Sequence, residues 1–469
     1  MSFLRMAIAG SWVIAMAASL QGQTSRISIS TSGAEGDANS GWFLGHETNW
    51  WYWQNPGGVA ISADGNRIVF ESKAENFATG DADSNSTDVF LRERSAGTTI
   101  QVSPLSTSTS YFFDPVISPN GSYVAYQAIV PGEIPYTARY TVSSQTRCVV
   151  NRDVPGYDGL NGCYQAAVAS DGAVVFEHHY SGGSAHFPTG YWWNGSDYIC
   201  PITEAGASCD TDQGSNSGTA CGNSVTIAYS RPAEFSPGPS PSVSGDGSVV
   251  SFVGLTYYIF CDANAVAQIF ARATSSCTNG TYELISKSSG GAAANQDCID
   301  PYISNTGQFV VFASAASNLV SGSSNGYLQI YVVDRTANTI RRVSVSTGGA
   351  LANGDCRKPS ITANGRYVAF ESEATNLVSG DTEGHTDIFV RDRDLDGNGT
   401  LDNPTLGNTV ATYRVSVSSS GAGGNQSSFG PSIAATASPV VVAFSSDASN
   451  LVSGDTNGFM DVFVHVGLP

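Results

Sequence analysis

The sequence predicts an all-β protein, a β-propeller of four-stranded antiparallel blades, with seven blades as the direct count, closed by the N-terminal strand. Three observations support this prediction: a phrase that recurs along the chain, a fixed order of strands and turns within each copy, and one copy that is split between the two chain ends. The composition agrees, because 51 glycines and only 13% charged residues among 469 suit many short strands joined by tight turns.

The repeated phrase is clearest from Pro359 to Arg393, which reads PSITANGRYVAFESEATNLVSGDTEGHTDIFVRDR, and it returns in altered form from Val59 to Arg94. More degenerate copies begin at Pro115, Ala166, Pro241, Pro301 and Pro431. These copies make seven units. A count of six stays open if the aberrant region 180 to 240 is an insertion.

Every unit has the same order of predicted strands. Two strands are joined by an Asn-Gly or Asp-Gly turn, which accepts positive φ, and the second strand ends in an aromatic residue such as Phe370. A third strand such as Asp387 to Arg391 follows a polar loop, and a fourth is expected at Arg342 to Val345 and at Arg414 to Val417. Because the strand at residues 367 to 370 is apolar on both faces, the sheets must stack face to face as blades.

The last unit ends at Pro469, soon after its third strand, and a lone copy of the fourth strand stands at Arg26 to Ser30. We therefore expect Arg26 to Ser30 to pair with Asp461 to Val464. Such pairing closes a ring and leaves no sheet edge exposed, which favours a closed propeller over an open solenoid.

These repeats resemble the bacterial TolB-type, WD-like propeller repeats, whose units combine an S-x-D-G-x-x-V-A-F hairpin with an N-L-V-x-G-D-T-N-G-x-x-D-I-F-V segment. The resemblance covers nearly all of the chain after its first residues. It implies a propeller and, since most such propellers are platforms without catalytic activity, a binding role. The third and fourth units depart from the pattern, because they lack the N-L-V-x-G-D segment.

Residues 1 to 22 are predicted to be a signal peptide, and residues 23 to 469 a single propeller domain. Arg5 supplies the positive charge, Met6 to Ala18 the apolar run, and Ala15 to Ala17 the small-x-small cleavage pattern. The alternative, a membrane anchor, needs about 20 apolar residues, more than this run contains. The sequence thus predicts a secreted, periplasmic or cell-surface protein without a membrane span. A net charge of −19 argues against nucleic-acid binding.

One inserted loop has the oxygen-rich spacing of a calcium site. Gly399 is the sixth residue counted from Asp394, as in EF-hand-like loops, but Thr405 stands where a bidentate Glu is expected at the twelfth position. The alternative is a solvated acidic turn. The related loops 81 to 88, 381 to 387 and 455 to 461 are better explained as capped turns. The predicted Ca²⁺ ligands are Asp394, Asp396, Asn398, Thr400 and Asp402.

Tryptophan is concentrated in one predicted inter-blade loop, residues 41 to 57, and the next such loop contains Tyr111, Phe112 and Phe113. Aromatic side chains on a rim stack on sugar rings or bury against a protein. The alternative is that they cover a blade edge or plug the channel. The predicted ligand-binding residues are Trp50, Trp51 and Trp53.

Disulfides are predicted from cysteine positions. Cys298 and Cys356 stand at equivalent places in successive units and could form a disulfide, and Cys148 is the expected partner of Cys163. A transition-metal site at the three histidines of the third unit is not favoured, because no further ligand lies at suitable spacing. These histidines are His178, His179 and His186.

No catalytic residue is predicted. Propeller glycosidases place carboxylates in the central channel, and only Asp114 and Asp300 are candidates, although a role in turns explains both better. The leading interpretation is therefore a binding or scaffolding module for a glycan, surface polymer or protein, stabilised by calcium. A propeller hydrolase or lyase that acts on polysaccharide is the alternative.

Overall fold

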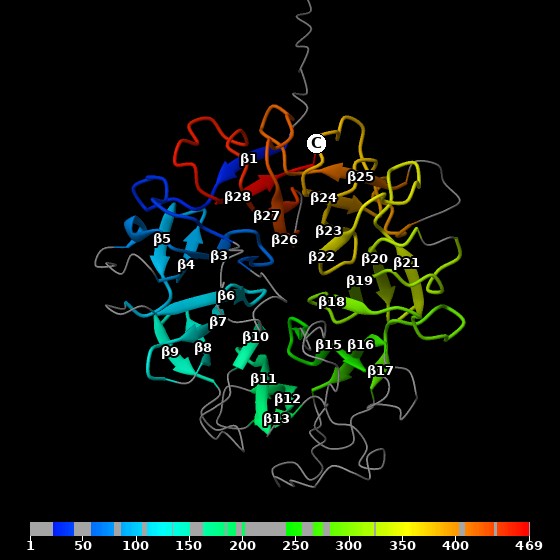
Figure 1. Cartoon of the computed structure of the whole chain (residues 1–469), viewed down its shortest axis with the longest axis horizontal. Helices are drawn as coiled ribbons and strands as arrows, with labels where there is room; N and C mark the ends of the chain where they lie inside the picture. Colours follow the sequence, from blue (N-terminus) through cyan, green and yellow to red (C-terminus); the bar gives the residue numbers. More distant parts are fainter. Residues whose placement is uncertain are drawn as a thin grey trace, which may run out of the picture.

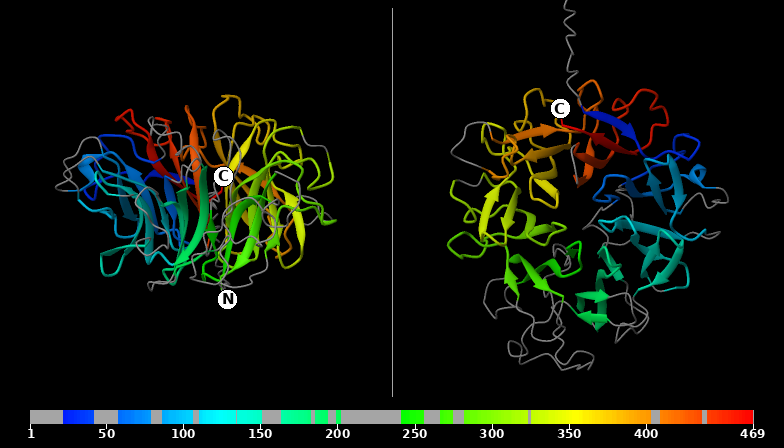
Figure 2. Two further views of the ribbon diagram at one scale, coloured as in Figure 1. Left: turned by 60° about the horizontal axis from the view of Figure 1, so that its bottom comes forward. Right: turned by 180° about the vertical axis from the view of Figure 1, so that it is seen from behind.

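The computed structural model shows sheets arranged in a ring, with one strand of each sheet toward the centre (Figure 1; Figure 2). It describes residues 22–41, 58–78, 86–105, 110–133, 135–150, 163–182, 185–193, 199–201, 241–255, 266–274, 282–322, 325–402, 409–435 and 439–468. These residues form seven four-stranded antiparallel sheets. A short 3-10 helix, η1 (Glu75–Phe77), follows one of the strands.

The sheets are numbered in chain order of their innermost strands. The first three sheets contain β2 (Val59–Ile61), β3 (Arg67–Ser72), β4 (Asp88–Glu93) and β5 (Thr98–Gln101); β6 (Tyr111–Ile117), β7 (Tyr123–Ile129), β8 (Tyr136–Thr141) and β9 (Thr146–Val149); and β10 (Cys163–Val168), β11 (Val174–Gly182), β12 (Ala185–Trp193) and β13 (Ile199–Pro201).

The fourth, fifth and sixth sheets contain β14 (Ser242–Val243), β15 (Val249–Leu255), β16 (Ala267–Ala273) and β17 (Glu283–Leu284); β18 (Cys298–Ile303), β19 (Phe309–Ser314), β20 (Gln329–Asp334) and β21 (Thr339–Arg342); and β22 (Cys356–Ile361), β23 (Tyr367–Ser372), β24 (Asp387–Asp392) and β25 (Ala411–Arg414). The seventh sheet combines β26 (Ser428–Ala434), β27 (Val441–Ser446) and β28 (Asp461–Val466) with β1 (Gln23–Arg26).

The predicted all-β propeller of four-stranded antiparallel blades is confirmed. The packing also agrees with the strands that are apolar on both faces. In one core cluster, Ile388 and Val390 of the sixth sheet pack with Val442 and Phe444 of the seventh. Each sheet therefore contributes one face to each of two neighbouring cores, as stacked sheets require.

The outer strands begin and end earlier than the sequence predicts. β21 ends at Arg342, which was expected to begin the fourth strand of its unit. The N–H of Val343 still donates to the Ile330 carbonyl at 2.9 Å, but the N–H of Ile330 donates to the Ser344 hydroxyl, also at 2.9 Å. A serine side chain thus replaces the next backbone acceptor and ends the ladder, and Ser416 does the same after β25.

The N-terminal strand shows the same shift. β1 pairs with β28 in antiparallel register, from Gln23 opposite Val466 to Arg26 opposite Phe463. Of the segment expected to pair, Arg26 to Ser30, only Arg26 belongs to the strand, although the N–H of Ile27 still donates to the Val462 carbonyl at 2.7 Å. The first and last strands of the described residues therefore lie side by side in one sheet (Figure 1).

Within the described residues, no helix is long and apolar enough to cross a membrane. The predicted signal peptide lies almost entirely outside the described residues, which begin at Gly22.

Candidate functional site

A serine near the fourth strand anchors the start of the third strand in five sheets. Each serine hydroxyl donates to a side chain at or next to the first position of that strand and accepts the following backbone N–H. In the sixth sheet, Ser416 donates to Asp387 at 2.5 Å and accepts the Ile388 N–H at 3.0 Å. The pairs are Ser28–Asp461, Ser103–Asp88, Ser286–Gln268, Ser344–Gln329 and Ser416–Asp387. The loop before the third strand is thereby fixed in the same way around much of the ring.

An arginine stands two residues before this serine in the sixth sheet, and three carboxylates surround it. Arg414 Nη1 lies 3.4 Å from Asp381, 3.3 Å from Glu383 and 3.2 Å from Asp387. The Asp381 and Asp387 side chains are each only 2% exposed. Gly423 makes room for the guanidinium, because a Cβ at this position would overlap Arg414 Nη2.

The seventh sheet repeats this cluster with residues from both ends of the chain. Arg26 Nη2 lies 2.8 Å from Glu35, and its Nη1 lies 3.7 Å from Asp455 and 3.1 Å from Asp461. Asn457 donates a further hydrogen bond of 3.1 Å to Asp461. Sequence reasoning missed both clusters, although the repeated R-[VI]-S-[VI]-S segment pointed to a shared role for Arg26 and Arg414.

Burial raises the pKa of Asp381 to about 6, and the nearby Asp387 charge acts in the same direction, whereas Arg414 opposes it. Burial likewise raises the pKa of Asp461 to about 6, against the hydrogen bond from Ser28 and the charge of Arg26. The pKa of Asp387 is also raised by burial. Three carboxyl groups surround one arginine in each cluster, so the cluster is negative when all three are ionised, and burial opposes that ionisation.

The two channel acids named from the sequence lie at bulges in the innermost strands. Asp114 (φ 49°) and Asp300 (φ 53°) have positive φ, and the register shifts at each of them. Asp300 accepts the Lys358 N–H at 3.2 Å and pairs with Lys358 Nζ at 3.2 Å. The Asp114 N–H donates to Glu71 at 3.0 Å. These contacts join neighbouring sheets, so both acids have a structural role here.

Glu71 is a buried carboxylate beside the channel-side bulge of the second sheet. Burial raises its pKa well above the usual range, and the charge of Asp114 adds to the effect. In the corresponding position of the sixth sheet, Glu371 accepts the Gly430 N–H at 2.8 Å, and burial raises its pKa as well. Each carboxylate thus serves as the acceptor for a bulge N–H of the next sheet.

The predicted calcium loop is described as far as Asp402. Asp394 is buried and accepts the N–H groups of Asn398 at 3.0 Å and Gly399 at 2.9 Å. The Asp396 carboxylate accepts the Asn398 side-chain amide at 2.7 Å, and the Thr400 N–H donates to the Asn398 side chain at 2.7 Å. The loop therefore coils around Asp394.

Asp402, in contrast, turns to Arg393, whose Nη2 lies 2.6 Å away. Among the described residues, no three or more Asp, Glu, His or Cys side chains form a group that could hold a metal. The structure does not bring the five predicted ligands together, and the calcium site stays a prediction.

The predicted ligand-binding residues Trp50, Trp51 and Trp53 lie outside the described residues. The three aromatic residues assigned to the next loop belong to β6 instead. Phe112 is 2% exposed and Phe113 is 4% exposed, so the structure places both in the core and not on a rim. The side chains of His178, His179 and His186 also lie outside what the structure describes.

The expected disulfide between Cys298 and Cys356 is wrong, because both are free thiols. Cys298 packs in the core between the fourth and fifth sheets, and Cys356 in the core between the fifth and sixth. Equivalent positions in adjacent blades thus face different cores. Burial raises the pKa of each thiol to about 12. Cys148 is free as well, and the Cys163 side chain lies outside the described residues.

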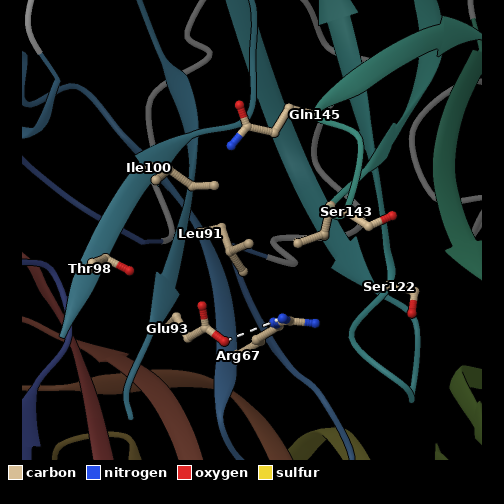
Figure 3. Close-up of a pocket in the computed structure, with 9 residues that line it drawn as sticks. Arg67, Leu91, Glu93, Thr98, Ile100, Ser122, Ser143 and Gln145 are labelled. Carbon is tan, nitrogen blue, oxygen red and sulfur yellow. Dashed lines mark hydrogen bonds and ion pairs between the residues drawn. The ribbon is translucent and has the colours of Figure 1, made fainter. Parts of the chain in front are cut away.

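A cavity of about 350 Å³ lies between the outer strands of the first and second sheets (Figure 3). Arg67 and Glu93 form an ion pair of 3.3 Å at its edge, and Leu91 and Ile100 supply apolar surface (Figure 3). Among the described lining residues only Arg67 and Glu93 are charged, and they neutralise each other.

Neither a protein-family model nor a curated protein sequence matches the chain. Among solved structures, the chain is similar to an oligogalacturonate lyase in complex with manganese, with a TM-score of 0.51 and 14% sequence identity over 96% of this chain and 94% of that chain.

The chain is also similar to TolB from Acinetobacter baumannii, with a TM-score of 0.37 and 13% identity. This match covers 67% of the chain and 63% of TolB, which is less than two thirds of that protein. A structure from a study of two prolyl endopeptidases matches with a TM-score of 0.47 and 10% identity, over 92% of this chain and 51% of that one. At 14% identity, the match to the lyase structure shows a similar fold and nothing further.

Proposed function

We propose that this chain is a secreted β-propeller that binds a glycan, surface polymer or protein on its loop rim and has no catalytic activity of its own. The main support is that the two acids named as candidates for catalysis make contacts between neighbouring sheets. Asp300 is tied to Lys358, and the backbone of Asp114 to Glu71, so that both join sheets. A glycosidase instead needs two carboxylates that face a substrate.

The rim formed by the loops between second and third strands supports a binding role. Tyr327 of the fifth sheet and Phe459 of the seventh follow the same Asn-Gly pair in their repeats, and they are 43% and 40% exposed. Exposed aromatic side chains at matching places in different blades offer stacking surfaces for a partner. In a four-stranded blade the loops that connect one blade to the next lie on this same rim, so we assign Trp50, Trp51 and Trp53 to the binding surface too.

We further propose that the scaffold is a ring of seven blades closed by β1. The pairing of β1 with β28 supports closure, and so does Ser28, which occupies in the seventh sheet the place that Ser416 has in the sixth. A ring without open edges is a stable frame for loops that bind.

Calcium is proposed as a stabilising ion at the loop Asp394 to Asp402, with Asp394, Asp396, Asn398 and Thr400 supplying oxygens. The support is the coiling of the loop around Asp394 and the concentration of hard oxygen ligands. Asp402 takes part only if it leaves Arg393.

A single purified sample, residues 23 to 469, tests the proposed function in a glycan and protein binding screen run beside a polysaccharide hydrolysis and lyase screen. Binding without turnover is expected. Tyr327→Ala combined with Phe459→Ala should weaken the binding, whereas Leu395→Ala should not, because Leu395 is 40% exposed in a loop on the opposite rim. Product formation at a rate that scales with protein concentration would establish the alternative, a propeller hydrolase or lyase.

A further inference from the structure

The arginine that anchors the third-strand loop recurs in the fifth sheet, as Arg342. It stands two residues before Ser344, as Arg414 stands before Ser416 and Arg26 before Ser28. The three serines make equivalent hydrogen bonds, so the three arginines occupy equivalent backbone positions in their sheets. Their surroundings can be compared position by position.

Every acid that meets the arginine in the sixth and seventh sheets has a neutral counterpart in the fifth. Where the sixth sheet has Asp381, Glu383 and Asp387, the fifth has Ser323, Asn325 and Gln329. Where the seventh has Glu35, the fifth has Leu351. The fifth sheet therefore has none of these acids at the equivalent positions, although it has the arginine.

Gln329 cannot replace the missing carboxylate. Its side-chain oxygen already accepts the Ser344 hydroxyl at 2.7 Å, and its amide nitrogen donates to Asn325 at 3.3 Å and to the Ala352 carbonyl at 3.2 Å. The Gln329 side chain thus presents an N–H donor at the position where Asp387 and Asp461 present a carboxylate acceptor to their arginines. The substitution removes a charge and reverses the hydrogen-bonding role of this position.

Arg342 is left without the partners that the other two arginines have. Its Nε and Nη2 atoms are covered by protein and have no hydrogen-bond partner among the described residues. The guanidinium carbon lies 5.6 Å from the centre of the Tyr331 ring, which supports the cation from one side. A covered guanidinium edge without an acceptor is costly, so an acceptor from outside the chain, such as water, an ion or a ligand, would stabilise Arg342.

Arg342 also lines a cavity of about 580 Å³. The neighbouring Arg341 contributes a second positive charge, and none of the lining residues that the structure describes is acidic. The remaining lining consists of two serines, two glycines and four aliphatic side chains, namely Ser289, Val320, Ser321, Gly322, Ile340, Val345, Gly349 and Leu351. On a chain with a net charge of −19, this cavity is a local positive site.

We propose that this cavity binds a small ligand that carries a carboxylate, with Arg342 as its principal contact. The planar fork of an arginine matches a carboxylate with two parallel hydrogen bonds, as it does within this chain at Arg366, whose Nε and Nη2 lie 2.8 Å and 2.9 Å from the two oxygens of Asp392. The ligand supplies the acceptor that the sixth and seventh sheets supply from their own side chains.

The proposal requires the Arg342 side chain to rotate so that Nε and Nη2, which are covered here, face the cavity. The volume is that of a small-molecule site and not of an extended macromolecular groove, and the serine hydroxyls and backbone groups suit a hydroxylated acid such as a uronic acid unit. Such a unit can be a free sugar acid or the end of an acidic polymer. The cavity includes Val320, Ser321 and Gly322 of a loop on the same rim, but the proposal rests on Arg342 and does not require the binding role assigned to Tyr327 and Phe459.

Isothermal titration with glucuronate, acetate and glucose on residues 23 to 469 tests the proposal. Glucuronate should bind and glucose should not, and acetate binding would show that the carboxylate alone is recognised. Arg342→Gln should weaken glucuronate binding by about 10- to 100-fold, the effect of losing charge-assisted hydrogen bonds. Oligogalacturonate that binds more tightly than glucuronate would identify a polymer as the source of the acid.

The chain offers a matched pair of variants that leaves Arg342 in place. Leu351→Glu introduces a carboxylate at the position from which Glu35 meets Arg26, so it should abolish glucuronate binding, whereas Leu351→Gln should preserve it. Comparable melting temperatures for the two variants exclude unfolding as the cause. Glucuronate binding no stronger than glucose binding, or equal binding by the Glu and Gln variants, would overturn the proposal.

Discussion

The Ser28 hydroxyl donates a hydrogen bond of 2.5 Å to Asp461, although the two residues are 433 positions apart in the chain. Ser28 also accepts the N–H of Val462 at 3.0 Å. Ser416 makes the same two contacts within a continuous unit, with Asp387 and Ile388. The N-terminal segment therefore makes, in the seventh sheet, the contacts that residues after β25 make in the sixth.

Replacing Ser28 by Ala should lower the free energy of unfolding by about 1–3 kcal/mol, because it leaves the buried Asp461 oxygen and the Val462 N–H with one partner fewer. Ser416→Ala should cost a similar amount, since its contacts are equivalent. Ser32→Ala is the control, because Ser32 lies at an exposed turn. Urea denaturation followed by fluorescence measures all three, and a Ser28→Ala value no larger than that of Ser32→Ala would argue against a structural role for this bond.

The stability of the calcium-free protein should depend on pH through Asp381. Burial raises the pKa of this carboxyl to about 6, above its usual 3.8, so the folded state binds more protons than the unfolded state between these values. The contribution of Asp381 to stability therefore decreases as pH rises from about 4 to about 6 and is constant above that. The groups that face it are Asp387, Glu383 and Arg414.

Asp381→Asn should accordingly stabilise the protein at pH 7 by roughly 1 kcal/mol, an amount that allows for screening near the loop surface, and should have little effect at pH 4. Thermal unfolding in EDTA at both pH values measures the difference. Equal effects of the substitution at pH 4 and pH 7 would contradict the assignment.

Calcium should bind the EDTA-stripped protein at one or more sites. Asp394→Ala combined with Asp396→Ala should remove a site, because these carboxylates carry the charge that the loop offers to a cation. Asp402→Ala should affect binding less, since Asp402 already pairs with Arg393 at 2.6 Å. Isothermal titration gives the number of sites. The absence of both heat and thermal stabilisation at millimolar calcium would show that the loop does not bind calcium.

Replacing Trp50, Trp51 and Trp53 together by Ala should weaken partner binding and leave the fold intact. The reason is that an aromatic cluster in an inter-blade loop contributes to recognition more than to the cores, which are built from strand residues such as Phe70 and Phe90. Circular dichroism checks the fold and the binding screen measures the loss. A large drop in melting temperature would show that the indoles support the blade stack instead.

The blades and their hairpins could be predicted from the sequence because the repeat specifies them locally. The Asn-Gly and Asp-Gly turns fall where the chain needs positive φ, for example at Gly65 (φ 71°) and Gly365 (φ 73°). The ends of the outer strands could not be predicted, because they depend on serine side chains that compete with the backbone for hydrogen bonds. Ser344 and Ser416 lie within segments that otherwise have the pattern of strands.

The arginine clusters could not be predicted because strand pairing brings their members together, between β24 and β25 in the sixth sheet and between the two chain ends in the seventh. Arg26 and Asp461 are neighbours in space through the pairing of the two chain ends. The error over Cys298 and Cys356 arose because their equivalent places in the repeat suggested proximity. In stacked blades, equivalent positions are separated by a whole sheet, and the two thiols pack in different cores.

The melting temperature of the chain without residues 23 to 31 tests the central structural claim most directly. If β1 completes the last blade, the truncated protein, beginning at Ser32, loses the pairing of Gln23 to Arg26 with β28 together with the bonds of Ser28. It should then aggregate or melt at a much lower temperature than the protein that begins at Gln23. An unchanged melting temperature would show that the last blade does not depend on the N-terminal strand and would contradict closure of the ring.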